Sequence, residues 1–466
     1  MVFTSLEFVF LFLPVSVAGY FLLPFRWNLK NYWLLAASLG FYAWGEPRFV
    51  FVMLLSIVFN WLLALGICWL RKCGRPGGAK SLLVTAVVGN LAMIGVWKYC
   101  NFLTVTFGDW FPFWQGMIPC TSFLLPIGIS FFTFQALSYV VDVSRGTEAE
   151  RNPLLLALYI ACFPQLIAGP IVRYSTVREK INGRRATWNQ FAGGIVRFMV
   201  GFNKKMLLAN AMALVADKAF SVSGPSCAFA WFGAVCYTLQ IYFDFSGYSD
   251  MAIGLGKIFG FEFPENFNYP YVSRSVSEFW RRWHMSLGSW FRDYVYFPLG
   301  GSRVGCRRLI FNLAVVWFLT GLWHGANWTF ILWGCLYGVL IAFEKLSGWA
   351  ERMETSGSMR CFYQPFTLLA VVLGWVLFRS ETVVSAGNYL AAMFGAAPLV
   401  DGNFVFWSRE VVLPFSCAVL GCANWWRRWT HPVFVAVGYV VQFVLFVCSV
   451  SCLVMKSHNP FIYFNF

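Results

Sequence analysis

Charged residues are scarce in this sequence. Asp, Glu, Lys and Arg make up 12% of its 466 residues, whereas 59% are hydrophobic. A soluble protein of this length needs far more polar surface, so the composition excludes that class and indicates an integral membrane protein. The apolar runs are continuous and do not alternate with polar residues, which favours helices over a transmembrane barrel. We therefore expect an all-α polytopic membrane protein whose residues 1–466 form a single membrane-embedded domain.

Several familiar catalytic and binding motifs are missing. The sequence contains no G-x-S-x-G elbow, no P-loop and no H-E-x-x-H, which removes the usual signals for a serine hydrolase, a nucleotidase and a zinc protease. Its 14 cysteines include no C-x-x-C or C-x-x-H pair. We therefore predict neither a metal site nor a disulfide framework, and no permanently bound cofactor.

Acidic residues are outnumbered. There are 35 Lys and Arg against 20 Asp and Glu, a formal net charge of +15. The basic residues gather in loops such as 71–80 and 173–185, as expected for cytoplasmic loops under the positive-inside rule. Because they are scattered between spans, nucleic acid is not an expected partner. A basic cytosolic face would also attract phosphate-bearing donors.

Apolar runs of helix length predict about eleven membrane passes. They lie at 2–24, 32–45, 48–70, 81–97, 120–141, 153–171, 193–215, 228–256, 309–346 (one or two passes), 364–378, 411–424 and 433–455. The run 153–171 ends in Pro164, Gly169 and Pro170, which predict a re-entrant or broken helix. Such backbone is tolerated at membrane depth where it is buried in protein or lines a cavity.

Only four histidines are present, and two of them, His284 and His324, fall within residues 274–328. The first part of this stretch has apolar residues at the i, i+3, i+4, i+7 spacing of one helix face from Val276 to Tyr294. Ser275 and Glu278 match a capping box, so a helix is expected to begin near 276. We expect an amphipathic segment over 274–303 that lies in the membrane interface, with His284 at the border between its faces.

His324 lies in the apolar run 309–346, which contains no other Asp, Glu, Lys, Arg or His than Glu344 and Lys345. A helix that enters at Leu309 would carry His324 about 22 Å along its axis, and neighbouring glycines predict a bend there. A charge inside a bilayer costs roughly 2–3 kcal/mol or more, so an ionisable residue there is a functional candidate. The alternative is a neutral histidine that shares one hydrogen bond with a neighbouring helix.

Polar residues also interrupt the run 228–256. Gln240 and Asp244 stand four residues apart and share a helix face, where they would line a cavity or make interhelical hydrogen bonds. The glycines from Gly254 to Gly260 have the wrong spacing for a nucleotide-binding fingerprint, and we interpret them as helix-packing positions.

Two segments resemble the signature pair of the membrane-bound O-acyltransferases. They read FWRRWHMSLGSWFRDYVYFPLGG (279–301) and LTGLWHGANWTFILWG (319–334), and QIYFDFSGYSDMAIG (240–254) resembles the bacterial branch. That branch acetylates exopolysaccharides such as alginate and cellulose, or transfers D-alanine to teichoic acids. The resemblance implies many helices around a central tunnel in the bacterial inner membrane. It also implies that His324 is the catalytic histidine and His284 the second motif histidine.

The resulting hypothesis is acyl transfer from a cytosolic thioester, with acetyl-CoA as the expected donor, to a hydroxyl. His324 would be the general base, and burial would keep its imidazole neutral. Other substrate or tunnel-lining candidates are Arg281 and Arg282 for donor phosphates, and Trp323 or Asn327 for the oxyanion. Expected partners are membrane lipid, a periplasmic or membrane-anchored acyl acceptor and polysaccharide synthase machinery. The alternative is a proton-coupled transporter or flippase that uses Asp244, Asp250 and His324 as a relay.

Overall fold

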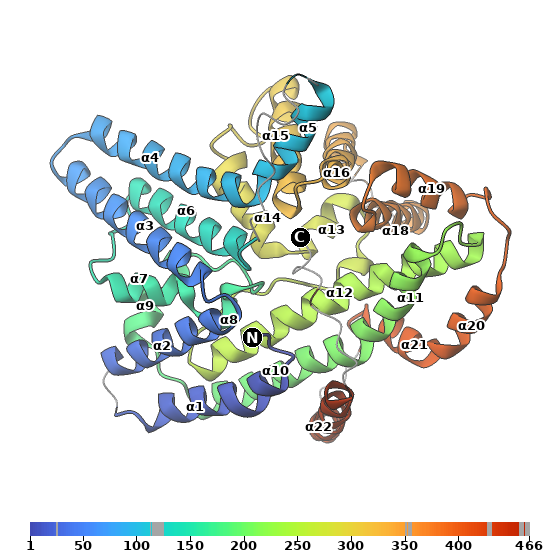
Figure 1. Cartoon of the computed structure of the whole chain (residues 1–466), viewed down its shortest axis with the longest axis horizontal. Helices are drawn as coiled ribbons and strands as arrows, with labels where there is room; N and C mark the ends of the chain where they lie inside the picture. Colours follow the sequence, from blue (N-terminus) through green and yellow to red (C-terminus); the bar gives the residue numbers. More distant parts are fainter. Residues whose placement is uncertain are drawn as a thin grey trace. The chain divides into compact units, whose positions relative to one another are not determined.

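The computed structural model describes residues 1–24, 27–111, 113, 125–349, 352, 357–425, 431–455 and 461. Helices account for nearly all regular structure within these ranges, and none of the residues described here forms a β-strand (Figure 1). The predicted all-α class is therefore confirmed. The predicted run 120–141 falls partly on residues 120–124, which lie outside the described ranges.

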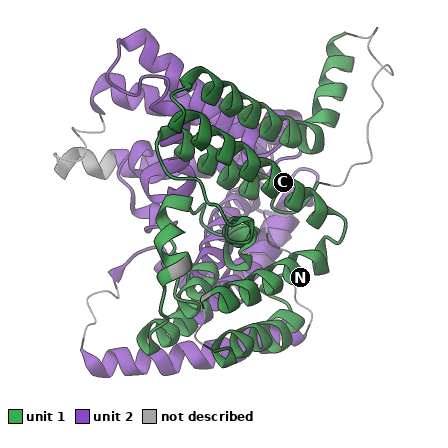
Figure 2. Cartoon of the chain, turned by 90° about the vertical axis from the view of Figure 1, so that its left-hand side faces the viewer, with its two compact units in different colours: residues 1–198, 251–264 green, residues 199–250, 265–466 purple. Residues whose placement is uncertain are grey.

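The chain divides into two compact units that alternate along the sequence (Figure 2). Unit 1 contains residues 1–198 and 251–264, and unit 2 contains residues 199–250 and 265–466. The long helix α12 (residues 227–258) contributes residues to both units. The single membrane-embedded domain stays a prediction.

Unit 1 is built from helices that follow the apolar runs. They are η1 (Phe8–Phe12), α1 (Leu13–Leu22), α2 (Trp27–Gly45), α3 (Phe49–Lys72), α4 (Pro76–Ile94), η2 (Gly95–Tyr99), α5 (Cys100–Trp110), α6 (Ile129–Arg145), α7 (Pro153–Ala161), α8 (Phe163–Leu166), α9 (Tyr174–Gly183) and most of α10 (Trp188–Asn203). Asn60 of α3 and Asn90 of α4 exchange amide hydrogen bonds of 2.7 and 3.1 Å. This buried pair fixes the register of two otherwise apolar helices.

The predicted break in the run 153–171 is confirmed. Helix α7 ends at Ala161, and α8 covers only Phe163–Leu166. Side chains on both sides of the break are buried, and Gln165 donates to the carbonyl of Tyr159. The irregular backbone is thus enclosed in protein, as a chain at membrane depth requires.

The helix-packing interpretation of the glycines from Gly254 to Gly260 holds for Gly254, whereas Gly260 follows the end of α12 and lies in a turn. A Cβ on Gly254 would lie 2.6 Å from the carbonyl oxygen of Gly194 and 2.7 Å from the amide nitrogen of Phe198. The absence of a side chain therefore lets the end of α12 approach the backbone of α10 within unit 1. Gly260 adopts a φ of 81°, a conformation that favours glycine.

Unit 2 carries both motif histidines. Its elements are η4 (Lys204–Ala209), α11 (Asn210–Ser221), most of α12, η5 (Pro270–Val272), α13 (Val276–Arg282), α14 (Met285–Phe291), η6 (Arg292–Tyr296), α15 (Cys306–His324), α16 (Trp328–Ser347), α18 (Gly357–Arg379), α19 (Val383–Met393), α20 (Gly402–Glu410), α21 (Val412–Gly421) and α22 (Pro432–Val454). The predicted run 309–346 is therefore two helices, α15 and α16, with a turn directly after His324.

Helices α15 and α16 form a tightly packed hairpin. A Cβ on Gly321 would overlap the carbonyl of Phe330, and one on Gly334 would overlap the carbonyl of Trp317. Small residues at the crossing allow the two backbones to come close, a common device in membrane helix pairs. The hairpin holds His324 at the end of α15, beside the start of α16.

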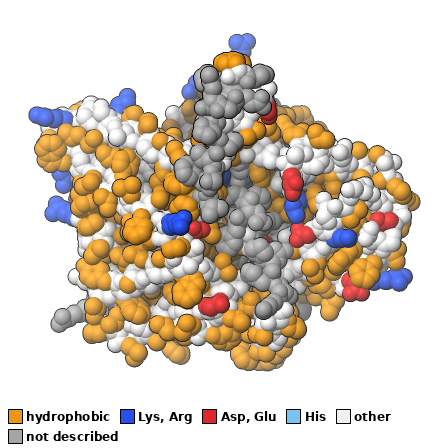
Figure 3. Space-filling model, viewed as in Figure 1, with side chains coloured by type: hydrophobic (Ala, Val, Ile, Leu, Met, Phe, Trp, Pro, Cys, Tyr) orange, Lys and Arg blue, Asp and Glu red, His pale blue; other side chains and the backbone are white. Residues whose placement is uncertain are grey.

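Among the described helices, five are long and apolar enough to cross a membrane. They are α3, the continuous stretch Pro76–Trp110, α15, α16 and α22, and the bent pair α20–α21 would make a sixth. Shorter apolar helices include Phe8–Leu22 and Val383–Met393. The prediction of about eleven passes also counted such short, broken or polar-containing segments. Hydrophobic side chains cover much of the face seen in Figure 3, as a lipid-facing surface requires.

Candidate active site

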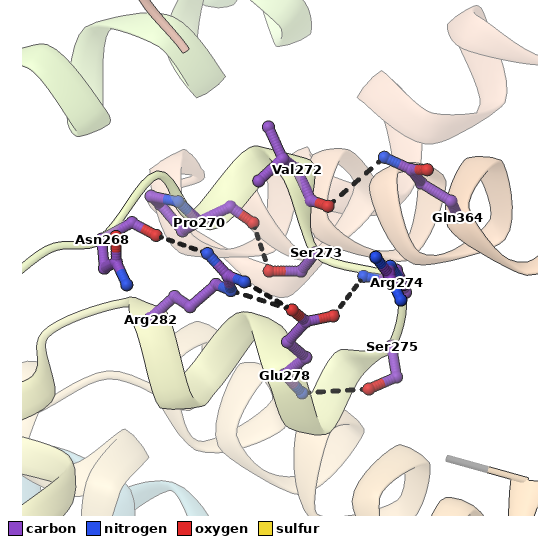
Figure 4. Close-up of polar contacts among 9 residues, drawn as sticks. All are labelled: Asn268, Pro270, Val272, Ser273, Arg274, Ser275, Glu278, Arg282 and Gln364. Atoms are coloured by element: carbon purple, nitrogen blue, oxygen red, sulfur yellow. Dashed lines mark hydrogen bonds and ion pairs between the residues drawn. The ribbon is translucent and has the colours of Figure 1, made fainter. Parts of the chain in front are cut away.

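The segment that carries His284 is not one continuous helix. Helix α13 ends at Arg282 and α14 begins at Met285, so the predicted amphipathic helix is broken at its centre. The predicted start is correct, because the Ser275 side chain accepts a hydrogen bond from the Glu278 amide at 3.0 Å. Glu278 does not complete the capping box, since its carboxylate binds the Arg274 amide at 2.7 Å (Figure 4). The apolar face, including Phe279 and Trp283, is buried within unit 2; the interfacial location of this segment stays a prediction.

His284 lies at the break in a left-handed conformation, with a φ of 44°. Non-glycine residues rarely adopt this region, and those that do often belong to functional sites. The side chain is 2% exposed, and its ring contacts Phe245 of α12 at a centroid distance of 4.7 Å. The residue lies outside the spanning helices, and burial lowers the pKa of its imidazole to about 3.

The hydrogen bonds of His284 define its tautomer. Nδ1 lies 3.1 Å from Oδ1 of Asn266, which also accepts from the Ser286 amide at 3.2 Å. A backbone N–H can only donate, so the Asn266 oxygen must face this side, and Nδ1 of His284 must carry the proton. Nε2 is therefore unprotonated and carries a lone pair. It is buried and has no hydrogen-bond partner among the described residues.

His324 is the final residue of α15 and is 4% exposed. Its ring makes edge-to-face contacts with Trp333 of α16 at 5.0 Å and Phe378 of α18 at 5.2 Å. Gly325 follows in an extended conformation and turns the chain toward α16. The predicted bend at His324 is therefore confirmed, and its imidazole packs among aromatic side chains.

Trp323 joins the two histidines. Its indole contacts the ring of His324 at 4.9 Å and that of His284 at 5.9 Å. The break at His284 and the end of α15 therefore meet around one tryptophan, as the resemblance of both motifs to one active site led us to expect. The catalytic roles of the histidines stay predictions.

Asn327 is the residue at which α16 begins. Its side-chain oxygen accepts from the Thr329 amide at 3.1 Å, and its nitrogen donates to the Glu381 carbonyl at 2.7 Å. These bonds cap the start of α16 and attach it to the α18–α19 connection. The Glu381 carbonyl thus uses one of the two protons of this amide nitrogen, and the oxyanion role of Asn327 stays a prediction.

The two predicted arginines differ in their surroundings. Arg281 is exposed. Arg282 is held by the Glu278 carboxylate at 2.8 Å and donates to the Asn268 carbonyl at 3.1 Å (Figure 4). The neighbouring carboxylate offsets the charge of Arg282, which therefore serves to hold α13 against the loop before it. Binding of donor phosphates by either arginine stays a prediction.

On α12, the predicted polar residues form ion pairs with η4. Asp244 binds Lys205 at 2.7 Å, with the two side chains only 1% and 4% exposed, and Asp250 binds Lys204 at 2.7 Å. Gln240 is buried, and its Oε1 has no hydrogen-bond partner within the described ranges. The pairing favours an interhelical role for Asp244 over a lining position.

Sequence reasoning missed three residues that shape this region: Asn266, Lys205 and Glu344. Lys205 could have been noticed, because two adjacent lysines interrupt the apolar run 193–215 while two aspartates interrupt the run 228–256. Glu344 stood out as an acid within the apolar run 309–346, but nothing in the sequence named its partners, and Asn266 gave no signal beyond its residue type. No group of three or more metal-ligating side chains occurs in the described part of the chain.

Comparisons with known proteins identify the class to which this fold and site belong. The profile of the membrane-bound O-acyltransferase family matches residues 150–381, a range that contains both histidines. The chain belongs to this family and is an O-acyltransferase of the membrane.

Individual members of the family are similar to this chain over most of its length. The chain is 45% identical over 404 residues to a protein of Azotobacter vinelandii named a probable alginate O-acetylase, covering 84% of this chain and 78% of the relative. It is 39% identical to a protein of the same description from Pseudomonas putida, over the full length of both. A peptidoglycan O-acetyltransferase of Helicobacter pylori is 34% identical over 85% of this chain and 80% of the relative.

Proposed function

We propose that this acyltransferase acetylates hydroxyl groups of an exported polysaccharide, with alginate the first candidate. The similarity to alginate O-acetylases over most of both chains supports this substrate class. The observation that carries the proposal is the position of His324, a nearly buried imidazole at the end of an apolar helix. Acetyl-CoA is the proposed donor, since it is an acetyl thioester that is available in the cytosol.

The reaction follows from the chemistry of these groups. His324 takes the proton of the acceptor hydroxyl as its oxygen attacks the thioester carbonyl. The new C–O bond forms, the C–S bond breaks, and the thiolate leaves and is protonated. Proton transfer of this kind typically contributes about 10²–10⁴-fold to the rate. Nε2 of His284 is unprotonated, so this atom can accept a hydrogen bond from a substrate but cannot donate one.

The cellular setting is part of the proposal. We place the chain in the bacterial inner membrane, with the donor reaching the site from the cytosol through a tunnel and the acetyl group leaving toward the periplasm. A hydroxyl of a periplasmic or membrane-anchored acceptor protein would serve as well as a sugar hydroxyl, because the same base acts on both. Polysaccharide synthase components are the proposed partners.

Purified protein in nanodiscs with radiolabelled acetyl-CoA and alginate oligosaccharides tests the proposal. We expect thioester cleavage and label in the sugar, and a loss of about 10²-fold or more in His324→Ala. His431→Ala is the matched control, because that histidine is exposed at the start of α22 and belongs to neither histidine motif. Cleavage that persists in His324→Ala would refute the role of this base. Transfer of D-alanine in place of acetate would refute the substrate class, and substrate movement without cleavage would refute the enzymatic mechanism.

A further inference from the structure

Asn266 is fully buried and binds the segment around His284 through both its backbone and its side chain. Its carbonyl accepts from the Met285 amide at 2.9 Å. Its side-chain oxygen accepts from the Ser286 amide, from the Ser286 hydroxyl at 2.9 Å and from Nδ1 of His284. Its side-chain nitrogen donates to the Ser249 hydroxyl of α12 at 3.1 Å.

These bonds explain how a strained turn persists. A non-glycine residue in the left-handed region is strained, and it persists only where several contacts hold the backbone in place. Asn266 captures the two amides that follow His284, and the Asn268 amide binds the Arg282 carbonyl just before it at 3.0 Å. The loop at 266–268 therefore clamps the break between α13 and α14 from both sides.

The same hydrogen bonds determine which imidazole nitrogen of His284 can accept a hydrogen bond from another group. Because Asn266 Oδ1 accepts the hydrogen bond from Nδ1–H, the unprotonated nitrogen of the ring is Nε2. Its lone pair is buried beside the Trp323 indole and has no hydrogen-bond partner among the described residues. The opposite tautomer would place a lone pair on Nδ1 against the lone pairs of Oδ1, a repulsive arrangement. One asparagine thus sets both the backbone and the protonation pattern of His284.

We propose that Asn266 is a positioning residue of the acyltransferase site, which fixes His284 as the Nδ1–H tautomer so that Nε2 accepts a hydrogen bond from a proton-bearing substrate group. The inference rests on the proposed function for its catalytic consequence, whereas the tautomer follows from the fold alone. Asn266 itself contacts no reacting atom in this arrangement and acts through His284.

Nitrogen-15 NMR of histidine-labelled protein in nanodiscs reads the tautomer directly. We expect a neutral Nδ1–H imidazole whose signals vanish in His284→Gln, which assigns them. Asn266→Leu should convert this residue to the Nε2–H form or to a mixture. The control is Asn312→Leu, which removes another fully buried asparagine of unit 2 that donates to the Gly301 carbonyl, and it should leave the His284 signals unchanged.

Asn266→Asp provides a second variant in case the leucine variant does not fold. Aspartate keeps the acceptor, so the Nδ1–H tautomer should persist while the charge shifts the Nδ1–H proton resonance downfield. An Nε2–H imidazole in the unmodified protein, or an unshifted resonance in Asn266→Asp, would overturn the proposal.

Acetyl transfer separates the two hypotheses. Asn266→Leu should lower kcat roughly 10–100-fold, the range seen when partners that orient a functional imidazole are lost, with most of the rate restored in Asn266→Asp. If the tautomer responds as expected in a protein that transfers no acetyl group, the proposed function fails and the positioning role stands. If acetyl transfer is normal but neither tautomer nor rate responds to Asn266→Leu, the positioning proposal fails alone.

Discussion

The carboxylate of Glu344 in α16 accepts a hydrogen bond of 2.7 Å from the backbone amide of Val276, the first residue of α13. It also accepts from the Ser277 amide at 2.8 Å and from the Tyr363 hydroxyl at 2.9 Å. A fully buried carboxylate is thereby paired with the otherwise unsatisfied N–H groups that begin a helix, where negative charge is favoured. The hairpin that carries His324 is tied in this way to the segment that carries His284.

Replacing Glu344 with Gln should destabilise the protein. One amide oxygen can replace only one carboxylate oxygen, so a buried donor at the start of α13 loses its partner, at a cost of about 1–3 kcal/mol. Thermal unfolding in nanodiscs measures this. Tyr363→Phe, which removes a single hydroxyl donor, should cost less, and equal effects of the two variants would contradict the capping role.

Breaking the Lys205–Asp244 pair should be costly, whereas removing it entirely should not. Lys205→Met leaves a buried carboxylate without its cation and should cost about 3–5 kcal/mol, while the double variant Lys205→Met/Asp244→Leu should regain most of that. Unfolding of the two single variants and the double variant forms the test. The half-exposed Lys204 offers a comparison, since Lys204→Met should cost less. Additive losses in the double variant would argue against a purely structural pair and for a direct role of Asp244.

Stability should fall with acidification because of His284. Burial lowers the pKa of His284 in the folded state from 6.5 to about 3. Between these two pH values the unfolded chain binds a proton at this imidazole that the folded chain does not bind. The free energy of unfolding is therefore unaffected by protonation of His284 above about pH 6.5. It declines as the pH falls below that value, by about 2 kcal/mol between pH 7 and pH 5. His284→Gln should lose less stability over this interval than the unmodified protein, and parallel pH profiles would contradict the burial.

The crossing of α15 and α16 should not tolerate even a methyl group. In Gly334→Ala the added carbon would overlap the Trp317 carbonyl, so we expect a loss of about 1–3 kcal/mol, as for overpacked cores. Gly438→Ala in α22 is the matched control, because nothing lies within 4 Å of the added carbon and alanine is the better helix former. Unfolding temperatures of the two variants compare them directly, and similar shifts would refute the close approach.

Much of this fold could be predicted from signals that are local in the sequence. Continuous hydrophobicity predicted the helical class, Pro164 and Gly169 predicted the break after α7, and Gly321 and Gly325 predicted the turn at His324. Ser275 predicted the start of α13, because an N-cap depends only on the residue and its next few neighbours.

The failures involve partners distant in sequence. The apolar period from Val276 to Tyr294 continues through His284, yet the helix breaks there because Asn266, 18 residues earlier, binds the amides of Met285 and Ser286. The period of apolar residues indicates which side of a segment is apolar. It does not indicate which of its backbone amides form hydrogen bonds with another segment. Asn327 shows the same limit: its capping bond to the Thr329 amide is local, but the bond that its side-chain nitrogen donates to the Glu381 carbonyl spans 54 residues.

The position of His324 at the last turn of α15 has a consequence for turnover. The carbonyl groups at the end of a helix carry partial negative charge, which favours a nearby cation by about 0.3–2 kcal/mol. An imidazole that takes up a proton during the proposed reaction becomes such a cation, within reach of the carbonyls that close α15. The peptide dipoles of the spanning helix would thus lower the energy of the charged state through which the proposed reaction passes.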